Sequence, residues 1–151
     1  MEIIPAPSKA AIVGHPINAA LVPFPIVCFT LTLGTDILYW RTGTLMWQNF
    51  SDWLLLAGLV MGGLAALAGI WDLLARPVLR RRQMGWIHGV GNIVVLILAF
   101  FNNLIHSRDG WIAVVPTGLI LSALTVLVLL CTVWIGRAMV YRHGIGVSYN
   151  E

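Results

Sequence analysis

The stretch GWIHGVGNIVVLILAFFNNLIH, residues 85–106, decides how this chain folds. It holds no Asp, Glu, Lys or Arg, and it is long enough to cross a bilayer as a helix, which takes about 20 apolar residues. Its polar side chains recur in alternating steps of four and three residues, in the series His88, Asn92, Val95, Ala99, Asn102 and His106. That spacing keeps one stripe on one face of a helix. We therefore predict a membrane-spanning helix whose stripe faces neighbouring helices.

Three further apolar stretches flank this one, at residues 17–40, 52–75 and 113–136. Only helices and closed barrels satisfy the backbone inside lipid, and the alternation typical of barrel strands is absent. The connections between the stretches are short, which favours antiparallel neighbours. We predict an all-α membrane protein: one domain over residues 1–151, folded as a four-transmembrane-helix up-down-up-down bundle, with a short tail at 137–151.

The composition excludes an ordinary soluble domain. Hydrophobic residues make up 59% of the chain and charged residues 10%, whereas soluble domains carry about 25% charged residues. The net charge of +3 comes from a few loop residues, so we interpret it as a determinant of membrane orientation and expect no nucleic-acid partner. No P-loop, nucleophile motif or dinucleotide fingerprint is present, so the sequence leaves open whether the protein is an enzyme.

The basic residues predict the orientation. Two of the nine, Arg41 and Arg108, fall on one side of the predicted membrane. The others fall on the opposite side: Lys9, Arg76, Arg80, Arg81, Arg82, Arg137 and Arg142. Because basic residues concentrate in cytoplasmic loops, we expect both termini in the cytoplasm.

The other spans carry stripes with the same spacing. These run through Asn18, Val22, Pro25, Phe29, Thr32 and Asp36; through Gly58, Gly62, Ala65, Gly69 and Asp72; and through Gly118, Ser122, Thr125, Leu129, Thr132 and Gly136. Small residues let helix backbones approach, and hydroxyls and amides bond across the interface. Pro23 and Pro25 lie inside the first apolar stretch, so we expect a kink there.

Packing these stripes together predicts a polar cluster at the cytoplasmic end, where His15 and His88 stand at the starts of two spans that run in the same direction. Neutral imidazole binds transition metals and haem iron. In this interpretation His15 and His88 bind the iron of a b-type haem, Asp72 and Asn92 support them, and Arg80 and Arg81 meet the propionates. A purely structural polar network and a proton or quinone site are the alternatives.

A second cluster is predicted at the outer end, with Asp36, Asn102, Asn103, His106 and Arg108 as its members and Asp52 nearby. The simplest interpretation is structural, an Asp36–Arg108 ion pair that ties the first span to the third. His106 falls at the end of its span, where we expect it to be solvated.

The chain also resembles a known family. The residues that carry the resemblance include Gly14-His15-Pro16, the run 21–26 (LVPFPI), the segment 57–72 and the run 141–147 (YRHGIGV). The chain resembles the predicted bacterial membrane proteins grouped as domain of unknown function 2231. The resemblance implies a four-span protein of the inner membrane. Some relatives are joined to Rieske-type iron–sulfur domains, which implies electron transfer. The family pattern has a second histidine where this chain has Asn18.

Two functions are therefore expected. The first is a redox-linked membrane subunit that binds b-type haem, or a quinone, near the cytoplasmic face, and its activity is electron transfer. The second is a non-catalytic structural or assembly subunit of a larger membrane complex. In either case the expected partners are the lipid bilayer and other membrane subunits or further copies of the chain. A transporter is a weaker interpretation, because no inverted repeat is visible.

Overall fold

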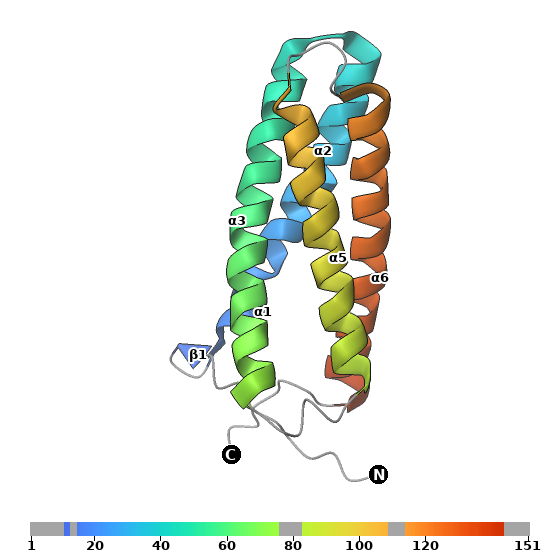
Figure 1. Cartoon of the computed structure of the whole chain (residues 1–151). Coiled ribbons are helices and arrows are strands. Elements are labelled where there is room, and N and C mark those ends of the chain that lie inside the picture. Colours follow the sequence, from blue (N-terminus) through green and yellow to red (C-terminus); the bar gives the residue numbers. More distant parts are fainter. Residues whose placement is uncertain (1–10, 13–14, 76–82, 109–113, 144–151) are drawn as a thin grey trace.

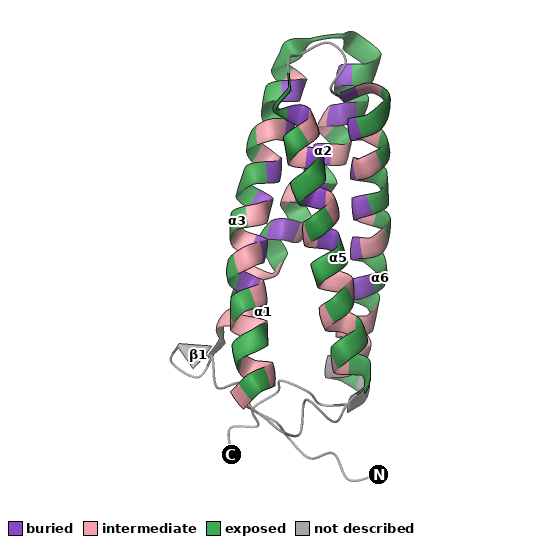
Figure 2. Cartoon of the chain, viewed as in Figure 1, coloured by how far each residue is buried: buried purple, intermediate pink, exposed green. Residues whose placement is uncertain are grey.

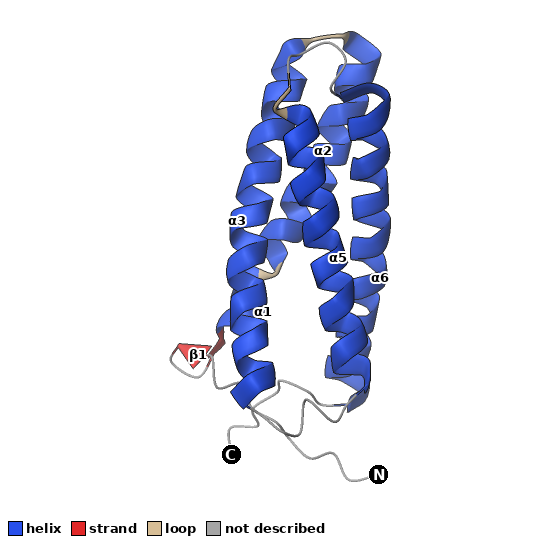
Figure 3. Ribbon diagram, viewed as in Figure 1, coloured by secondary structure: helices blue, strands red, loops and turns tan. Residues whose placement is uncertain are grey.

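The computed structural model describes residues 11–12, 15–75, 83–108 and 114–143 (Figure 1). Its main elements are helices: α1 (Ile17–Leu21), α2 (Pro23–Thr42), α3 (Leu45–Ala75), α5 (Gln83–His106), the π-helix η2 (Val114–Gly118) and α6 (Leu119–His143). Two short strands, β1 (Ala11–Ile12) and β2 (His15–Pro16), pair antiparallel before α1. Figure 3 shows how little of the described chain lies outside helices.

The helices form one bundle of four spans. Ile17–Thr42, Leu45–Ala75, Gln83–His106 and Val114–Met139 are each long and apolar enough to cross a membrane. Each span runs antiparallel to the next (Figure 1). α2 packs on α3, α3 on α5 and α5 on α6, and α6 returns to contact α2, which closes the bundle. This confirms the predicted four-span helical architecture.

α3, the helix of the second span, begins seven residues earlier than expected, at Leu45 instead of residue 52. Gly43 adopts a left-handed conformation with φ 65°, and its N–H donates to the Tyr39 carbonyl at 2.8 Å, which ends α2 in a tight turn. Only Gly43 and Thr44 then separate α2 from α3. The earlier start places Gln48 and Ser51 on a helix face, where both are buried.

The first span is broken where the prolines predicted it. α1 ends at Leu21 and α2 begins at Pro23, because a proline nitrogen has no hydrogen to donate to the preceding turn. The Asn18 side chain donates to the backbone carbonyl of Ala65 at 2.8 Å, so α1 is held against α3. At the break itself the N–H of Val22 still donates to the Asn18 carbonyl at 3.0 Å.

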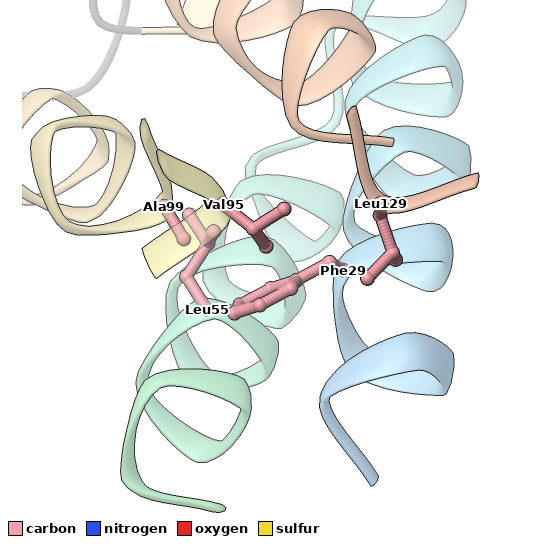
Figure 4. Packing of buried hydrophobic residues seen from close by; sticks show 5 residues of the cluster. All are labelled: Phe29, Leu55, Val95, Ala99 and Leu129. Atoms are coloured by element: carbon pink, nitrogen blue, oxygen red, sulfur yellow. The ribbon is translucent and has the colours of Figure 1, made fainter. Parts of the chain in front are cut away.

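The predicted stripes are the buried faces of the helices, as Figure 2 shows along the inward sides of the bundle. Each of the four spans contributes to one apolar layer, made of Phe29, Leu55, Val95, Ala99 and Leu129 (Figure 4). The outward faces carry large apolar side chains instead, and Trp134 is 77% exposed. A surface of this kind is suited to lipid, so the protein is a multi-pass membrane protein.

Candidate functional site

A buried carboxylate lies at the end of the bundle where α2 leads into α3. Asp36, on α2, is completely inaccessible to solvent. Its Oδ1 accepts the hydroxyl of Ser51 from α3 at 2.6 Å, and its Oδ2 accepts the hydroxyl of Ser122 from α6. Ionisable side chains within a membrane span are costly unless they are bonded. Asp36 therefore stays inside the bundle through bonds from two neighbouring helices.

The imidazole of His106 completes this site from the last turn of α5. The ring is buried, and its Nε2 lies 2.9 Å from Asp36 Oδ1. Its Nδ1 lies 3.0 Å from the backbone carbonyl oxygen of Asn102. A carbonyl oxygen only accepts, so Nδ1 carries a hydrogen and donates it. The contact between Nε2 and Asp36 then holds one further proton, which belongs either to the ring or to the carboxyl group.

Amide and hydroxyl groups surround the Asp36–His106 pair. Asn102 donates from Nδ2 to Ser122 at 2.7 Å, and Gln48 donates from Nε2 to the backbone carbonyl of His106 at 3.4 Å. The carboxylate of Asp52 lies close enough to His106 and Asp36 to interact with both electrostatically. We call these residues, Asp36, Gln48, Ser51, Asp52, Asn102, His106 and Ser122, the polar cluster.

The polar cluster corrects two expectations. Asp36 pairs with His106 and not with Arg108, whose side chain is exposed. His106 is 1% exposed rather than solvated. The physical reason is the position of each residue in α5: His106 is the last helical residue and continues the buried stripe, whereas Arg108 lies beyond the helix end. Asn103, on the neighbouring face, donates to the backbone carbonyl of Asp52 at 3.5 Å.

The other predicted cluster contains a smaller group around His88. Its Nδ1 lies 3.0 Å from the carbonyl oxygen of Thr132 on α6, so Nδ1–H donates to that oxygen. Its Nε2 accepts from the Asn92 side chain at 3.0 Å. Both ring nitrogens are thus occupied, and iron ligation through Nε2 requires the Asn92 amide to move away. The ring packs against Gly136, where an added Cβ would lie 3.0 Å from His88 Cε1.

The structure does not test the other predicted haem contacts as one site. The side chain of His15 and residues Arg80 and Arg81 lie outside the described part of the chain. Asn18 bonds to α3, and Asp72 is partly buried near the end of that helix. A joint site of His15 and His88 therefore stays a prediction.

Sequence reasoning missed Gln48 and Ser51, because both fell in the expected loop. The only available signal was their spacing, since residues 48, 51, 55, 58, 62 and 65 continue the predicted stripe toward the start of α3. Ser122 lay on a predicted stripe but was not assigned to a site. Within the described residues, no three His, Cys, Asp or Glu side chains are grouped to hold a metal ion.

Comparison with known proteins gives the family. No curated protein and no solved structure matches the chain. A family model described as predicted membrane protein, DUF2231, matches residues 14–149, a range that contains every helix of the bundle and both histidine sites. The chain therefore belongs to the DUF2231 family of predicted membrane proteins.

Proposed function

We propose that this chain is a proton-binding membrane subunit in which the Asp36–His106 pair takes up and releases a proton inside the bilayer. The observation that carries the proposal is the fixed role of His106 Nδ1. Nδ1–H donates to the Asn102 carbonyl, so the 2.9 Å contact between Nε2 and Asp36 needs a second proton. That proton is bonded either to His106 Nε2 or to the Asp36 carboxyl group.

The residues around the pair are compatible with the proton on either group. Hydroxyls of Ser51 and Ser122 donate to the carboxylate and stabilise its ionised form beside an imidazolium. When the proton moves to the carboxyl group, acid and imidazole are both neutral, so the net charge of the pair is the same. Gaining one proton gives an imidazolium beside a neutral acid, and losing one gives a carboxylate beside a neutral imidazole. Carboxylate and histidine groups within spans are the usual components of proton relays.

Isotope-edited infrared spectroscopy of the purified protein tests this proposal. The carboxyl band of Asp36 should change between its acid and carboxylate forms as pH is varied, and Asp36→Asn should remove that band. Replacing His106 with Gln should move the midpoint of the change, because the pair loses its ionisable partner. Asp72→Asn, at the opposite end of α3, is the matched control and should leave the Asp36 band unaltered.

A carboxyl band of Asp36 that does not change at any pH at which the protein stays folded would contradict proton exchange. The polar cluster would then be a structural network, and the chain a structural or assembly subunit of a larger membrane complex. That is the alternative function, and the abundant small residues on the inward stripes are compatible with it.

A redox role at His88 is a second candidate. It is favoured by the position of the ring, which lies between α5 and α6, packs against Gly136 and donates to the Thr132 carbonyl. In this proposal His88, with His15, holds a b-type haem, or the same end of the bundle binds a quinone. The bound cofactor would supply one-electron chemistry, while this chain would orient it.

The visible absorption spectrum checks the haem proposal. Protein purified from cells supplied with haem should show a Soret band, and His88→Ala should abolish it. Asn92→Ala should keep or strengthen the band, because it frees Nε2 from its present hydrogen bond. His106→Ala is the control and should leave the band intact. Wild-type protein without a Soret band would end the haem proposal.

The orientation is also a proposal: the chain lies in a bacterial inner membrane with both termini in the cytoplasm. It rests on the uneven distribution of the nine basic residues. Reporter fusions after Met84 and at Glu151 should report the cytoplasm, whereas fusions after Gln48 and Asp109 should report the outside. An outside signal after Met84 would reverse the orientation.

A further inference from the structure

Three buried oxygen atoms of the polar cluster have no hydrogen-bond donor among the described residues. They are Gln48 Oε1, Asp52 Oδ1 and Asn102 Oδ1. Gln48 is 5% exposed and Asn102 is fully buried. Buried polar atoms are nearly always bonded, and an unbonded acceptor costs about 1–3 kcal/mol. Three such atoms in one cluster therefore point to a bound group that satisfies them.

The orientation of each amide is fixed by chemistry. Ser122 gives its only hydroxyl hydrogen to Asp36, so it can only accept from Asn102, and the atom facing it must be Nδ2. Likewise, Gln48 faces the His106 carbonyl, which accepts but does not donate. Rotating either amide would place two acceptors against each other. Gln48 Oε1 and Asn102 Oδ1 therefore point away from these contacts and are free to accept from another group.

Among the described residues, no donor forms a hydrogen bond with any of the three oxygens. Ser51 and Ser122 both donate to Asp36, and the Nδ1–H of His106 donates to the Asn102 backbone. The charges of the polar cluster are unbalanced as well. Two carboxylates, Asp36 and Asp52, stand against one imidazole, so the cluster is negative by one charge when the pair holds its shared proton and Asp52 is ionised. Uncompensated charge is costly at membrane depth.

We propose that the polar cluster binds a small monovalent cation of the alkali-metal class, with the side-chain oxygens of Gln48, Asp52 and Asn102 as its ligands. Carbonyl and carboxylate oxygens are the ligands that hard cations prefer. A monovalent cation both balances the negative charge of the cluster and coordinates the three unpartnered oxygens. A neutral hydrogen-bond donor satisfies the oxygens but leaves the charge unbalanced.

Thermal unfolding in detergent, at constant pH and constant total salt, tests this with Na⁺ as the probe and choline as the replacement cation. A ligand that binds only the folded state stabilises it in a saturable way. Wild-type protein should therefore unfold at a higher temperature as Na⁺ replaces choline. Gln48→Leu and Asp52→Asn should each weaken the apparent Na⁺ affinity by about tenfold or more, because each removes a ligand oxygen or its charge.

Gln83→Leu is the matched control, since it makes the same change at an exposed position at the start of α5 and should leave the Na⁺ response as in wild type. If a cluster variant fails to fold, sodium NMR of the wild-type protein measures binding directly through line broadening. The same unfolding temperature in Na⁺ and choline, or equal Na⁺ responses in wild type and both cluster variants, would overturn the proposal. Because pH stays fixed, the result is independent of whether the Asp36–His106 pair exchanges protons.

Discussion

Replacing His106 with Ala should destabilise the bundle by about 3 kcal/mol, the cost typical of removing one partner of a buried ion pair. The substitution leaves Asp36 completely buried with only the hydroxyls of Ser51 and Ser122 as donors. Unfolding of the purified protein in detergent, followed by circular dichroism, measures the loss. The difference in unfolding free energy between wild type and His106→Ala should become smaller as pH falls, because a proton then neutralises the carboxylate that has lost its imidazole.

His88→Ala is the matched control for this variant. That ring is only partly buried and bonds to a neutral amide and a carbonyl, so its removal should cost less. A variant that combines Asp36→Ala with His106→Ala should be less destabilised than the sum of the single variants, as residues in direct contact are. Fully additive effects would show that Asp36 and His106 do not interact in the folded protein.

Replacing Gly58 with Leu should be comparably damaging, by about 3 kcal/mol, through overpacking. A Cβ added at Gly58 would lie 2.5 Å from Cε1 of Phe29 and 3.1 Å from Cβ of Cys28. Figure 4 shows the Phe29 ring among the buried side chains of Leu55, Val95 and Leu129 from the other three spans. The new side chain would force α2 and α3 apart, and the unfolding temperature in detergent reports the effect.

Gly63, on the outward side of the same helix, provides the control. An added Cβ there would meet no atom within 4 Å, so Gly63→Leu should be neutral or mildly stabilising, as expected when a helix-interior glycine is replaced. Equal unfolding temperatures for Gly58→Leu and Gly63→Leu would contradict the close packing of α2 and α3.

The spacing of residues predicted the buried faces well for a physical reason. Burial in a left-handed bundle repeats every seven residues, and in a membrane the polar or small side chains mark that face while the lipid side stays apolar. The positions of Phe29, Leu55, Val95 and Leu129 in one layer follow from this rule. The break before Pro23 also followed from local chemistry.

The sequence placed Asp36, Asn102 and His106 in one cluster, but the hydrogen-bond partners within it were harder to predict. A histidine at the end of a span has the same sequence context whether it is solvated or turned inward, so spacing alone did not separate the two outcomes for His106. The run QNFSD, residues 48–52, is polar enough to suggest a loop, and only the turn at Gly43 shows that α3 has already begun. The choice of His106 over Arg108 as the partner of Asp36 depended on where α5 ends.

Nitrogen NMR of the protein with isotope-labelled histidine rings tests directly whether Asp36 and His106 share an exchangeable proton. We expect Nδ1 of His106 to stay protonated throughout, while the Nε2 signal moves between its protonated and unprotonated positions as pH changes. His88 should remain a neutral ring with its hydrogen on Nδ1, since Nε2 accepts from Asn92. A His106 ring whose Nδ1 is unprotonated, or whose Nε2 signal does not change with pH, would show that Asp36 and His106 do not exchange a proton.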